Sequence, residues 1–148
     1  MYPTTPIPGR APIDSHPGAR ALVIIRNVTL GTVSDKLHVD AVLDTGSTHC
    51  IVPPSVAKLL GYHRGNRLGA QGTNVVGGGQ RLLDRHSLDY VKVGTARANR
   101  ISFLVAEFGT DYRFFVLLGL SFIRKFMLTV NFDDNLILFR SRSTNGHQ

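Results

Sequence analysis

The sequence predicts an all-β fold: a small closed or sandwich-like β-sheet with two short helices. Short apolar runs, many of them rich in Val, Ile and Phe, alternate with Gly-, Asn- and Asp-containing turns along most of the chain. Helical spacing of apolar residues is confined to two brief stretches. With 148 residues, 43% of them hydrophobic, the chain can form one domain around one core.

Three regions differ in composition. Residues 1–20 contain five of the seven prolines, and proline cannot donate a hydrogen bond to a sheet. We therefore expect a flexible N-terminal arm there, with ordered structure beginning near Ala21. Residues 21–140 form the expected domain, and residues 141–148 form a polar tail.

The expected elements follow in order. Residues 21–33 and 36–43 read as the two strands of a hairpin, and residues 50–52 as a third strand. A short helix is expected over residues 53–61, because proline stands at its start and glycine at its end. Val56, Leu59 and Leu60 fall on one face of this helix.

In the second half of the domain, the residue pattern predicts further strands at 87–93 and 100–106. An apolar strand follows at 114–119, and we expect it to be buried on both faces. A second helix is expected over 120–126, with Leu120, Ile123 and Phe126 on one side. Two strands joined by a tight turn, 127–132 and 136–139, complete the domain.

The rest of the chain is organised around an acidic loop. Apolar residues 41–43 lead to Asp44, and Thr45, Gly46 and Ser47 surround that carboxylate with small residues and hydroxyl groups. Glycine is expected at position 46 because it adopts conformations closed to other residues and leaves room beside the carboxylate. An ordinary turn aspartate is the alternative reading, because Asp, Gly and Ser are common in turns.

A glycine-rich stretch over residues 65–79 ends in Val75-Val76-Gly77-Gly78-Gly79. Consecutive glycines favour a mobile loop tip. A phosphate-binding loop is the competing interpretation, but no Lys-Ser/Thr pair follows and no long helical pattern begins there.

Three features follow one another at this spacing: the acidic loop, the glycine-rich hairpin, and the Leu117-Leu118-Gly119 strand end that runs into a short helix. Together they resemble the retropepsin family of single-domain aspartic proteases. The resemblance covers about residues 22–139 and implies a closed β-barrel with a flap hairpin. The proline-rich arm and the additional strand at 136–139 depart from the retroviral pattern, so the dimer contact of that family is not carried over.

The resemblance implies roles for individual residues. Asp44 matches the catalytic aspartate, and Thr45 matches the residue whose hydroxyl ties two catalytic loops together across a dimer. Gly46 matches the small residue of the motif, and Ser47 the neighbour whose hydroxyl can bond the carboxylate. Residues 75–80 match the flap over a bound peptide, with Val75, Val76, Gly77, Gly78 and Gly79 as its substrate-binding part. Gly119 matches the glycine that allows close packing behind the catalytic loop.

The chain contains a single Asp-Thr-Gly sequence, and its other aspartates lie outside comparable loops. Acid–base hydrolysis of a peptide by this chemistry uses two carboxylates, one to accept a proton and one to donate it. We therefore expect a homodimer in which Asp44 of each subunit contributes to one site. The expected function is an aspartic endopeptidase that cuts extended polypeptides; the alternative is an inactive relative that binds peptides or dimerises a partner in the same cleft.

Other function classes find little support. Seventeen basic and 10 acidic residues give a formal net charge of +7, but the basic residues are scattered, so we expect no nucleic-acid partner. No apolar run approaches the about 20 residues of a membrane helix, and no signal-peptide pattern is present. The six histidines show no metal-binding spacing, so neither metal nor cofactor is expected.

Cys50 is the only cysteine, so no intrachain disulfide can form, which fits a cytoplasmic location. We expect a buried small hydrophobe at this position. A nucleophilic role with His49 as its base is less favoured, because adjacent residues on a strand point to opposite faces.

Overall fold

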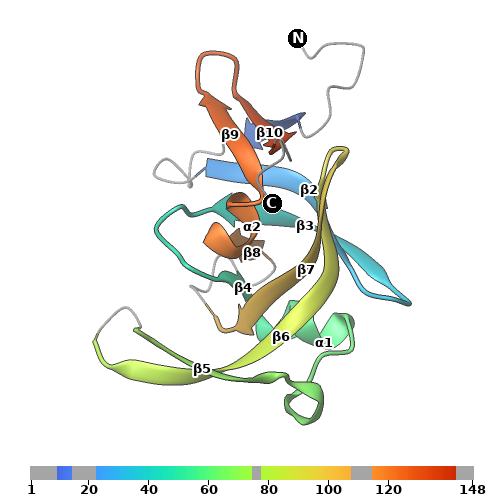
Figure 1. Ribbon diagram of the computed structural model, residues 1–148, viewed down its shortest axis with the longest axis vertical. Helices are drawn as coiled ribbons and strands as arrows, with labels where there is room; N and C mark the ends of the chain where they lie inside the picture. The colour runs from blue at the N-terminus through green and yellow to red at the C-terminus, as the bar shows by residue number, and fades with distance from the viewer. Residues whose placement is uncertain (1–9, 15–22, 75–77, 108–114, 143–148) are drawn as a thin grey trace.

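A computed structural model describes residues 10–14, 23–74, 78–107 and 115–142. Its elements are β1 Arg10–Asp14, β2 Val23–Gly31, β3 Lys36–Leu43, β4 Cys50–Val52, α1 Pro54–Leu59, the 3₁₀ turn η2 Arg64–Asn66, β5 Gly69–Asn74, β6 Gln80–Val93, β7 Ala96–Val105, β8 Phe115–Leu118, α2 Leu120–Ile123, β9 Phe126–Asn131 and β10 Leu136–Ser141. The strands dominate the molecule, and the two α-helices lie against them (Figure 1).

Six strands close into a mixed β-barrel. Their order is β6-β7-β4-β8-β3-β2, and an additional pairing of β6 with β2 completes the ring. At this closure Gly31 lies opposite Tyr90. A Cβ atom at position 31 would lie 2.0 Å from the Tyr90 ring, so glycine is needed where the barrel closes. The closed β-barrel expected from the resemblance is thus confirmed.

Two strands of the barrel pair in parallel with neighbours that are distant in sequence. β8 runs parallel to β3, with Leu43 opposite Leu118, and β4 runs parallel to β7. β8 also contacts β4, so it lies between two strands that follow each other in the chain. This insertion brings the end of β8 next to the loop that joins β3 to β4.

The barrel encloses one main core. Residues from β2, β6, β7, β8, α2 and β10 contribute to it, and the largest side chains with less than 2% exposure include Ile25, Leu30, Ile101, Phe103 and Phe122. Phe122 of α2 and Phe139 of β10 pack edge to face at 5.6 Å. The strand that the sequence analysis described as an addition therefore forms part of the core.

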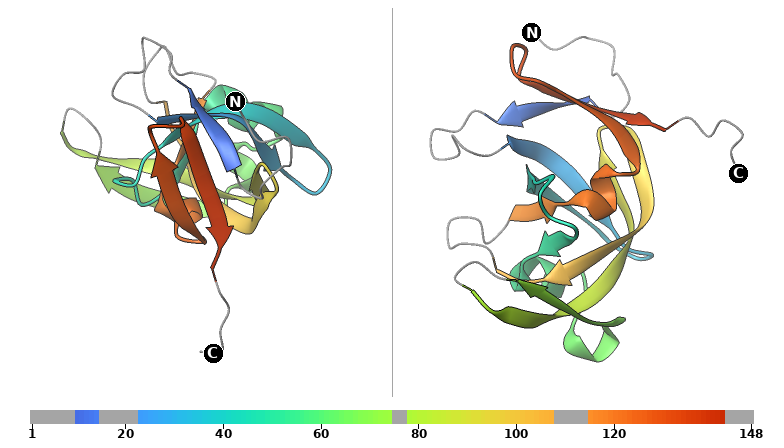
Figure 2. Two further views of the ribbon diagram at one scale, coloured as in Figure 1. Left: turned by 90° about the horizontal axis from the view of Figure 1, so that it is seen from above. Right: turned by 60° about the vertical axis from the view of Figure 1, so that its left-hand side comes forward.

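β6 extends beyond the barrel and pairs with β5 to form a long hairpin arm, with Gly69 opposite Arg85 and Asn74 opposite Gln80. Figure 2 shows this arm curving away from the barrel below the remaining strands. The expected flap hairpin is present, although β5 lies in a segment that the sequence analysis interpreted as loop.

A second small sheet contains β1, β10 and β9, in that order. The expectation that order begins near Ala21 is wrong for β1, which contains Pro12. Arg10, Ala11 and Pro12 pair with β10, whereas Ile13 and Asp14 pair with β2. Pro12 lies where the strand changes partner, a place where a missing N–H can be accommodated.

The helices are shorter than expected and one packs differently. In α1, Val56 and Ala57 are buried, but Leu59 is 63% exposed, so Leu59 does not share the buried face predicted for it. α2 ends at Ile123, and Phe126 begins β9 instead of closing the helix. Within the described residues, neither helix is long and apolar enough to cross a membrane.

β8 is not buried on both faces. Val116 and Leu118 are buried, whereas Phe115 and Leu117 are half-buried. Leu117 lines an open cleft. One face of β8 thus belongs to the core, and the other is directed at a potential binding site. Both faces are apolar, so the sequence could not distinguish them.

Candidate active site

The site is built on the loop that follows β3. The main-chain N–H of Asp44 donates to the carbonyl oxygen of Leu118 at 3.0 Å, which fixes the end of β3 against β8. The N–H of Gly46 donates to Asp44 Oδ1 at 2.9 Å, and the N–H of Ser47 donates to the Asp44 carbonyl oxygen at 3.3 Å. The Asp44 carboxylate is therefore held by its own loop and is half-buried.

Gly46 leaves space beside the carboxylate and does not adopt an unusual backbone conformation. It is not among the glycines with positive φ. A Cβ atom at this position would lie 3.2 Å from Asp44 Oδ1, closer than ordinary van der Waals contact. The expected room beside the carboxylate is thus present, while the expected special conformation is not.

The two hydroxyl residues of the loop lie in different surroundings. Thr45 is exposed. Ser47 is half-buried, and its Oγ donates to the main-chain oxygen of His49 at 2.8 Å. The single hydroxyl proton of Ser47 is therefore directed at the loop backbone, and the contact expected with the Asp44 carboxylate is not the one observed.

The start of α2 supports this loop from behind. The N–H of Leu120 donates to the carbonyl oxygen of Ser47 at 2.8 Å, and the N–H of Ser121 donates to that of Thr48 at 3.0 Å. Such close contact requires Gly119, because a Cβ atom there would lie 2.2 Å from the His49 oxygen and 2.6 Å from the Ser47 oxygen.

Ser121 connects the loop to the barrel. Its Oγ accepts a hydrogen bond from the N–H of Cys50 at 3.1 Å and lies 3.1 Å from the carbonyl oxygen of Ser102, to which it can donate. Cys50 is 3% exposed, and this burial raises the pKa of its thiol. The prediction of a buried small hydrophobe at Cys50 is confirmed.

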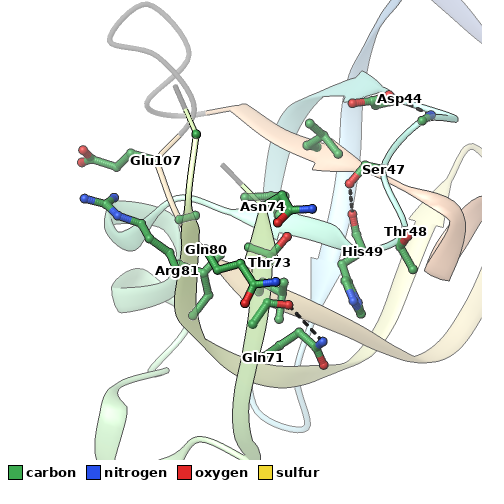
Figure 3. Close-up of a pocket in the computed structure, with 18 residues that line it drawn as sticks. Asp44, Ser47, Thr48, His49, Gln71, Thr73, Asn74, Gln80, Arg81 and Glu107 are labelled. Atoms are coloured by element: carbon green, nitrogen blue, oxygen red, sulfur yellow. Dashed lines mark hydrogen bonds between the residues drawn. The ribbon is translucent and has the colours of Figure 1, made fainter. Parts of the chain in front are cut away.

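Asp44 lies in an open cleft of about 1330 Å³ between the Asp44 loop and the hairpin arm. One wall contains the loop residues 46–49, and the other contains residues from both strands of the β5–β6 arm. The floor includes Leu117 of β8 and Leu104 of β7. Figure 3 shows the Asp44 loop at one side of this cleft and the arm at the other.

The flap residues are only partly described. Gly78 lines the cleft, and Gly78 and Gly79 adopt positive φ angles of 93° and 87°. These conformations favour glycine and explain two of the consecutive glycines. Val75, Val76 and Gly77 lie outside the described residues.

Polar and charged side chains line much of the cleft, and the sequence analysis did not identify them. They are His49, Gln71, Thr73, Asn74, Gln80, Arg81 and Glu107. Arg81 and Glu107 lie at the end of the cleft away from Asp44 (Figure 3). Half-buried and exposed positions alternate over 69–74, as in a strand, but the residue types in this segment do not alternate and gave no signal of it.

A buried aromatic group lies at the base of the hairpin arm. His86 is 2% exposed and stacks on Phe103 with ring centroids 5.5 Å apart. Burial lowers the pKa of His86; the charge of Asp84 opposes this effect and His63 adds to it. Tyr62 packs against both rings and donates from its hydroxyl to the Ser87 carbonyl oxygen at 2.8 Å.

Metal-binding side chains do not gather at the cleft. In the part of the chain that the structure describes, no three His, Cys, Asp or Glu side chains lie close enough together to hold an ion.

Comparisons with known proteins agree with this geometry. A retropepsin-like aspartic protease from Rickettsia conorii has the same fold, with a TM-score of 0.67 and 20% identity over 95% of this chain and 97% of that one. The retroviral protease-like domain of Ddi1 from Leishmania major matches with a TM-score of 0.54 and 17% identity over 81% and 94% of the two chains. No sequence among the curated proteins compared with the chain gave a match.

The family assignment rests on the sequence match. The family model described as aspartyl protease matches residues 29–122, a span that includes the Asp44 loop, the hairpin arm and Gly119. The chain therefore belongs to the aspartyl protease family and has the retropepsin-like fold.

Proposed function

We propose that this protein is an aspartic endopeptidase that acts as a homodimer, with Asp44 of each subunit sharing one site. The observation that carries the proposal is the position of the Asp44 carboxylate, held by the Gly46 N–H at 2.9 Å and directed into a cleft of about 1330 Å³. Family membership supplies the reaction class.

The need for a second subunit follows from the carboxylates of one chain. Among the described residues, Glu107 is the other carboxylate that lines the cleft, and it lies at the opposite end from Asp44 (Figure 3). A water attacking an amide needs one group to accept its proton and another to protonate the carbonyl oxygen. A twofold axis beside the loop would bring a second Asp44 to the first. The exposed position of Thr45 supports its expected role in tying the two loops together.

Two such carboxylates in contact share one proton, as in aspartic proteases generally, because both cannot be charged at low cost. The charged member accepts a proton from water, and the water oxygen bonds to the carbonyl carbon. The protonated member donates to the carbonyl oxygen. Transfer of a proton to the amide nitrogen then breaks the C–N bond and releases an acid and an amine.

The substrate that fits this cleft is an extended polypeptide. The cleft is open, and β5 is the outer strand of the hairpin arm, so its main chain offers hydrogen-bonding groups to a strand-like ligand. Gly78 and Gly79 at the end of the arm would provide the mobility with which the flap closes over the peptide. Thr45, Gly46, Ser47 and residues 75–79 are the proposed substrate-binding positions.

The test is cleavage of a peptide library by the purified chain and by Asp44→Asn, from acidic to neutral pH. We expect cleavage by the unchanged chain and none by Asp44→Asn, while Asp89→Asn, an exposed position on β6, serves as the matched control and retains activity. Equal cleavage by the Asp44→Asn chain would contradict the proposal.

The dimeric site has its own test. Excess Asp44→Asn chains should draw unchanged chains into inactive mixed dimers, so activity should fall as they are added. Activity that does not respond would show that one chain suffices. Peptide binding without cleavage, in a dimeric chain, would instead support an inactive peptide-binding module.

A further inference from the structure

Polar side chains of four strands share one outer face of the barrel. Thr29 of β2 lies opposite His38 of β3 on one side and Lys92 of β6 on the other. Lys92 in turn lies opposite Arg97 of β7. Directly opposed residues of neighbouring strands point to the same side of a sheet. Leu30, the neighbour of Thr29 in β2, is 1% exposed and belongs to the core, so the row that contains Thr29 faces outward.

A second row of outward side chains runs beside the first. Gly31 lies opposite Lys36 of β3 and also opposite Tyr90 of β6. Tyr90 in turn lies opposite Asn99 of β7. We call six residues of the two rows the cationic face: Lys36, His38, Tyr90, Lys92, Arg97 and Asn99. None of these six lines the cleft that contains Asp44, and Lys36 begins β3, whose other end leads to Asp44. The cationic face is therefore separate from the candidate active site.

The register of the sheet gathers cations that are far apart in the sequence. The expectation of no nucleic-acid partner rests on the scatter of the basic residues along the chain. The pairings of β2 with β3 and β6, and of β6 with β7, bring Lys36, Lys92 and Arg97 onto one face. The scatter is therefore no argument against an anionic partner at this face, and the formal net charge of +7 favours one.

Among the described residues, no ion pair neutralises the cationic face. Two ion pairs occur there, and neither contains a member of this face: Arg26–Asp40 and Arg67–Asp84. Asp35 accepts from the main-chain N–H of Lys36 at 2.9 Å, which holds its carboxylate at the β2–β3 turn. Burial raises the pKa of Tyr62 to about 12, and the charge of Asp89 adds to this effect, so Asp89 lies near Tyr62 at the base of the arm. The two cations of the first row are thus available to an anion.

The guanidinium of Arg97 is held in position by its neighbours. Its carbon Cζ lies 4.0 Å from the centroid of the Tyr90 ring, and its Nε donates to Asn99 Oδ1 at 3.0 Å. Tyr90 itself packs against Gly31, where the ring occupies the space of a Cβ atom. Arg97 is exposed, so the stacked ring and guanidinium present a flat cationic surface to solvent. Because this surface is already ordered, little side-chain freedom is lost when a ligand binds to it.

We propose that the cationic face binds single-stranded nucleic acid. Lys36 and Lys92 contact phosphates, and the guanidinium plane of Arg97 stacks on an unpaired base. Asn99 accepts from Arg97 through its oxygen, so its amide nitrogen can donate to a base edge. Proteins bind single strands through cations that follow the backbone and flat groups on which bases stack. A duplex hides the faces of its bases and an acidic peptide has no flat anionic unit to stack, so the fixed plane of Arg97 favours an unpaired base.

Fluorescence anisotropy of a labelled oligouridylate, titrated with the full chain at several salt concentrations, tests the proposal. With three cations on phosphates, the logarithm of the association constant should fall against the logarithm of the salt concentration with a slope of about −2. Lys92→Gln should reduce this slope by about 0.7 and weaken binding about fivefold at about 0.1 M salt. Arg64→Gln, an exposed change in η2 that alters the net charge equally, is the matched control and should leave binding unchanged. Equal affinities of Lys92→Gln and the control would overturn the proposal.

Two variants of Arg97 separate its charge from its flat surface. Arg97→Gln should weaken binding at least about tenfold, because it removes the charge and the stacked plane together. Arg97→Lys keeps the charge, so the salt slope should stay the same, but binding should weaken about fivefold because the lysine has no plane on which a base can stack. An Arg97→Lys chain that binds as tightly as the unchanged chain would overturn the assignment to unpaired bases.

Competition identifies the class of partner. An unlabelled single strand should displace the labelled one, whereas inorganic phosphate, polyglutamate and phosphatidylserine vesicles at the same concentration of anionic groups should not. A duplex of the same length should compete less well than the single strand. Equal displacement by polyglutamate would overturn the proposal in favour of an acidic protein partner, and equal displacement by vesicles would do so in favour of a lipid surface.

The cationic face and the cleft are tested separately. Asp44→Asn and Arg81→Gln change residues of the cleft and should bind the oligonucleotide like the unchanged chain. Weaker binding by Arg81→Gln than by Lys92→Gln would place the strand in the cleft and overturn the proposal. A chain that binds the oligonucleotide and cleaves no peptide would support the cationic face and count against the proposed protease. Circular dichroism of each variant verifies that it is folded.

Discussion

A Cβ atom at Gly119 would lie 2.2 Å from the main-chain oxygen of His49. The start of α2 and the loop that carries Asp44 are therefore in direct backbone contact, with no room for a side chain between them. This contact limits where the loop can lie. It leads to the first of four predictions.

Gly119→Ala should destabilise the protein by about 3 kcal/mol or more, because the added carbon meets backbone atoms that cannot rotate away. Gly46→Ala adds the same group beside one carboxylate oxygen at 3.2 Å and should preserve most of the stability while reducing peptide cleavage. Urea unfolding and cleavage assays of both variants compare the two effects. Similar unfolding midpoints for Gly119→Ala and the unchanged chain would contradict the prediction.

Gly78→Pro should slow peptide cleavage with little change in the unfolding midpoint. Gly78 has a φ angle of 93°, which the proline ring cannot adopt, and it lies at the exposed end of the arm. Gly69→Ala is the matched control, because Gly69 lies on the same arm outside the cleft residues and an added Cβ would lie 3.4 Å from the Arg85 side chain, an ordinary contact. Unaltered kinetics in Gly78→Pro would mean that this turn does not act as the flap.

The buried His86 predicts a pH dependence of stability. Because burial lowers its pKa in the folded protein, the unfolded chain takes up a proton first as the pH falls below 6.5. The free energy of unfolding should therefore decrease as the pH falls from 6.5 to the lower pKa of His86 in the folded protein. Below that pKa, His86 should cause no further decrease. Above pH 6.5 the residue is neutral in both states and contributes no pH dependence.

His86→Phe keeps an aromatic ring against Phe103 and removes the titrating group. Urea unfolding of this variant and of the unchanged chain at about pH 7.5 and about pH 5.5 measures the effect. The variant should lose less stability on acidification. An equal loss in both proteins would show that other groups cause the pH dependence.

Arg81 should influence which peptides are cut. It lies on the arm at the end of the cleft away from Asp44 (Figure 3). A cation there favours acidic substrate residues some distance from the cut bond, and Arg81→Gln should reduce kcat/KM for such peptides by about two- to fivefold, the size typical of an exposed charge pair. Arg64→Gln in η2 carries the same change outside the cleft residues and should not alter the preference.

The sequence was sufficient to identify the features that depend on a few neighbouring residues. The Asp44 loop, the glycines at 78 and 79 and Gly119 at the end of β8 are each positions where small residues are needed, and Gly119 lies against the Asp44 loop in the structure. The strands around the core followed from their apolar runs. Their order did not, because the insertion of β8 between β3 and β4 depends on contacts between distant segments.

The errors also have physical causes. Pro12 was taken as a sign that no strand could form, but a strand that changes partner at that residue needs no hydrogen bond from it. Leu59 fits a helical face, but Ala57 occupies the buried position and leaves Leu59 in solvent. The charged lining of the cleft was missed because an exposed arginine in a cleft and one on an open surface look alike in a sequence.

The insertion of β8 has a consequence for how the protein is made. A ribosome releases the Asp44 loop long before the segment that fixes it, because the hydrogen-bond acceptor for the Asp44 N–H is on Leu118 and the support behind the loop begins at Gly119. A nascent chain that has not reached α2 cannot hold this carboxylate in place. Synthesis itself thus delays the assembly of the supported Asp44 loop until most of the polypeptide has emerged.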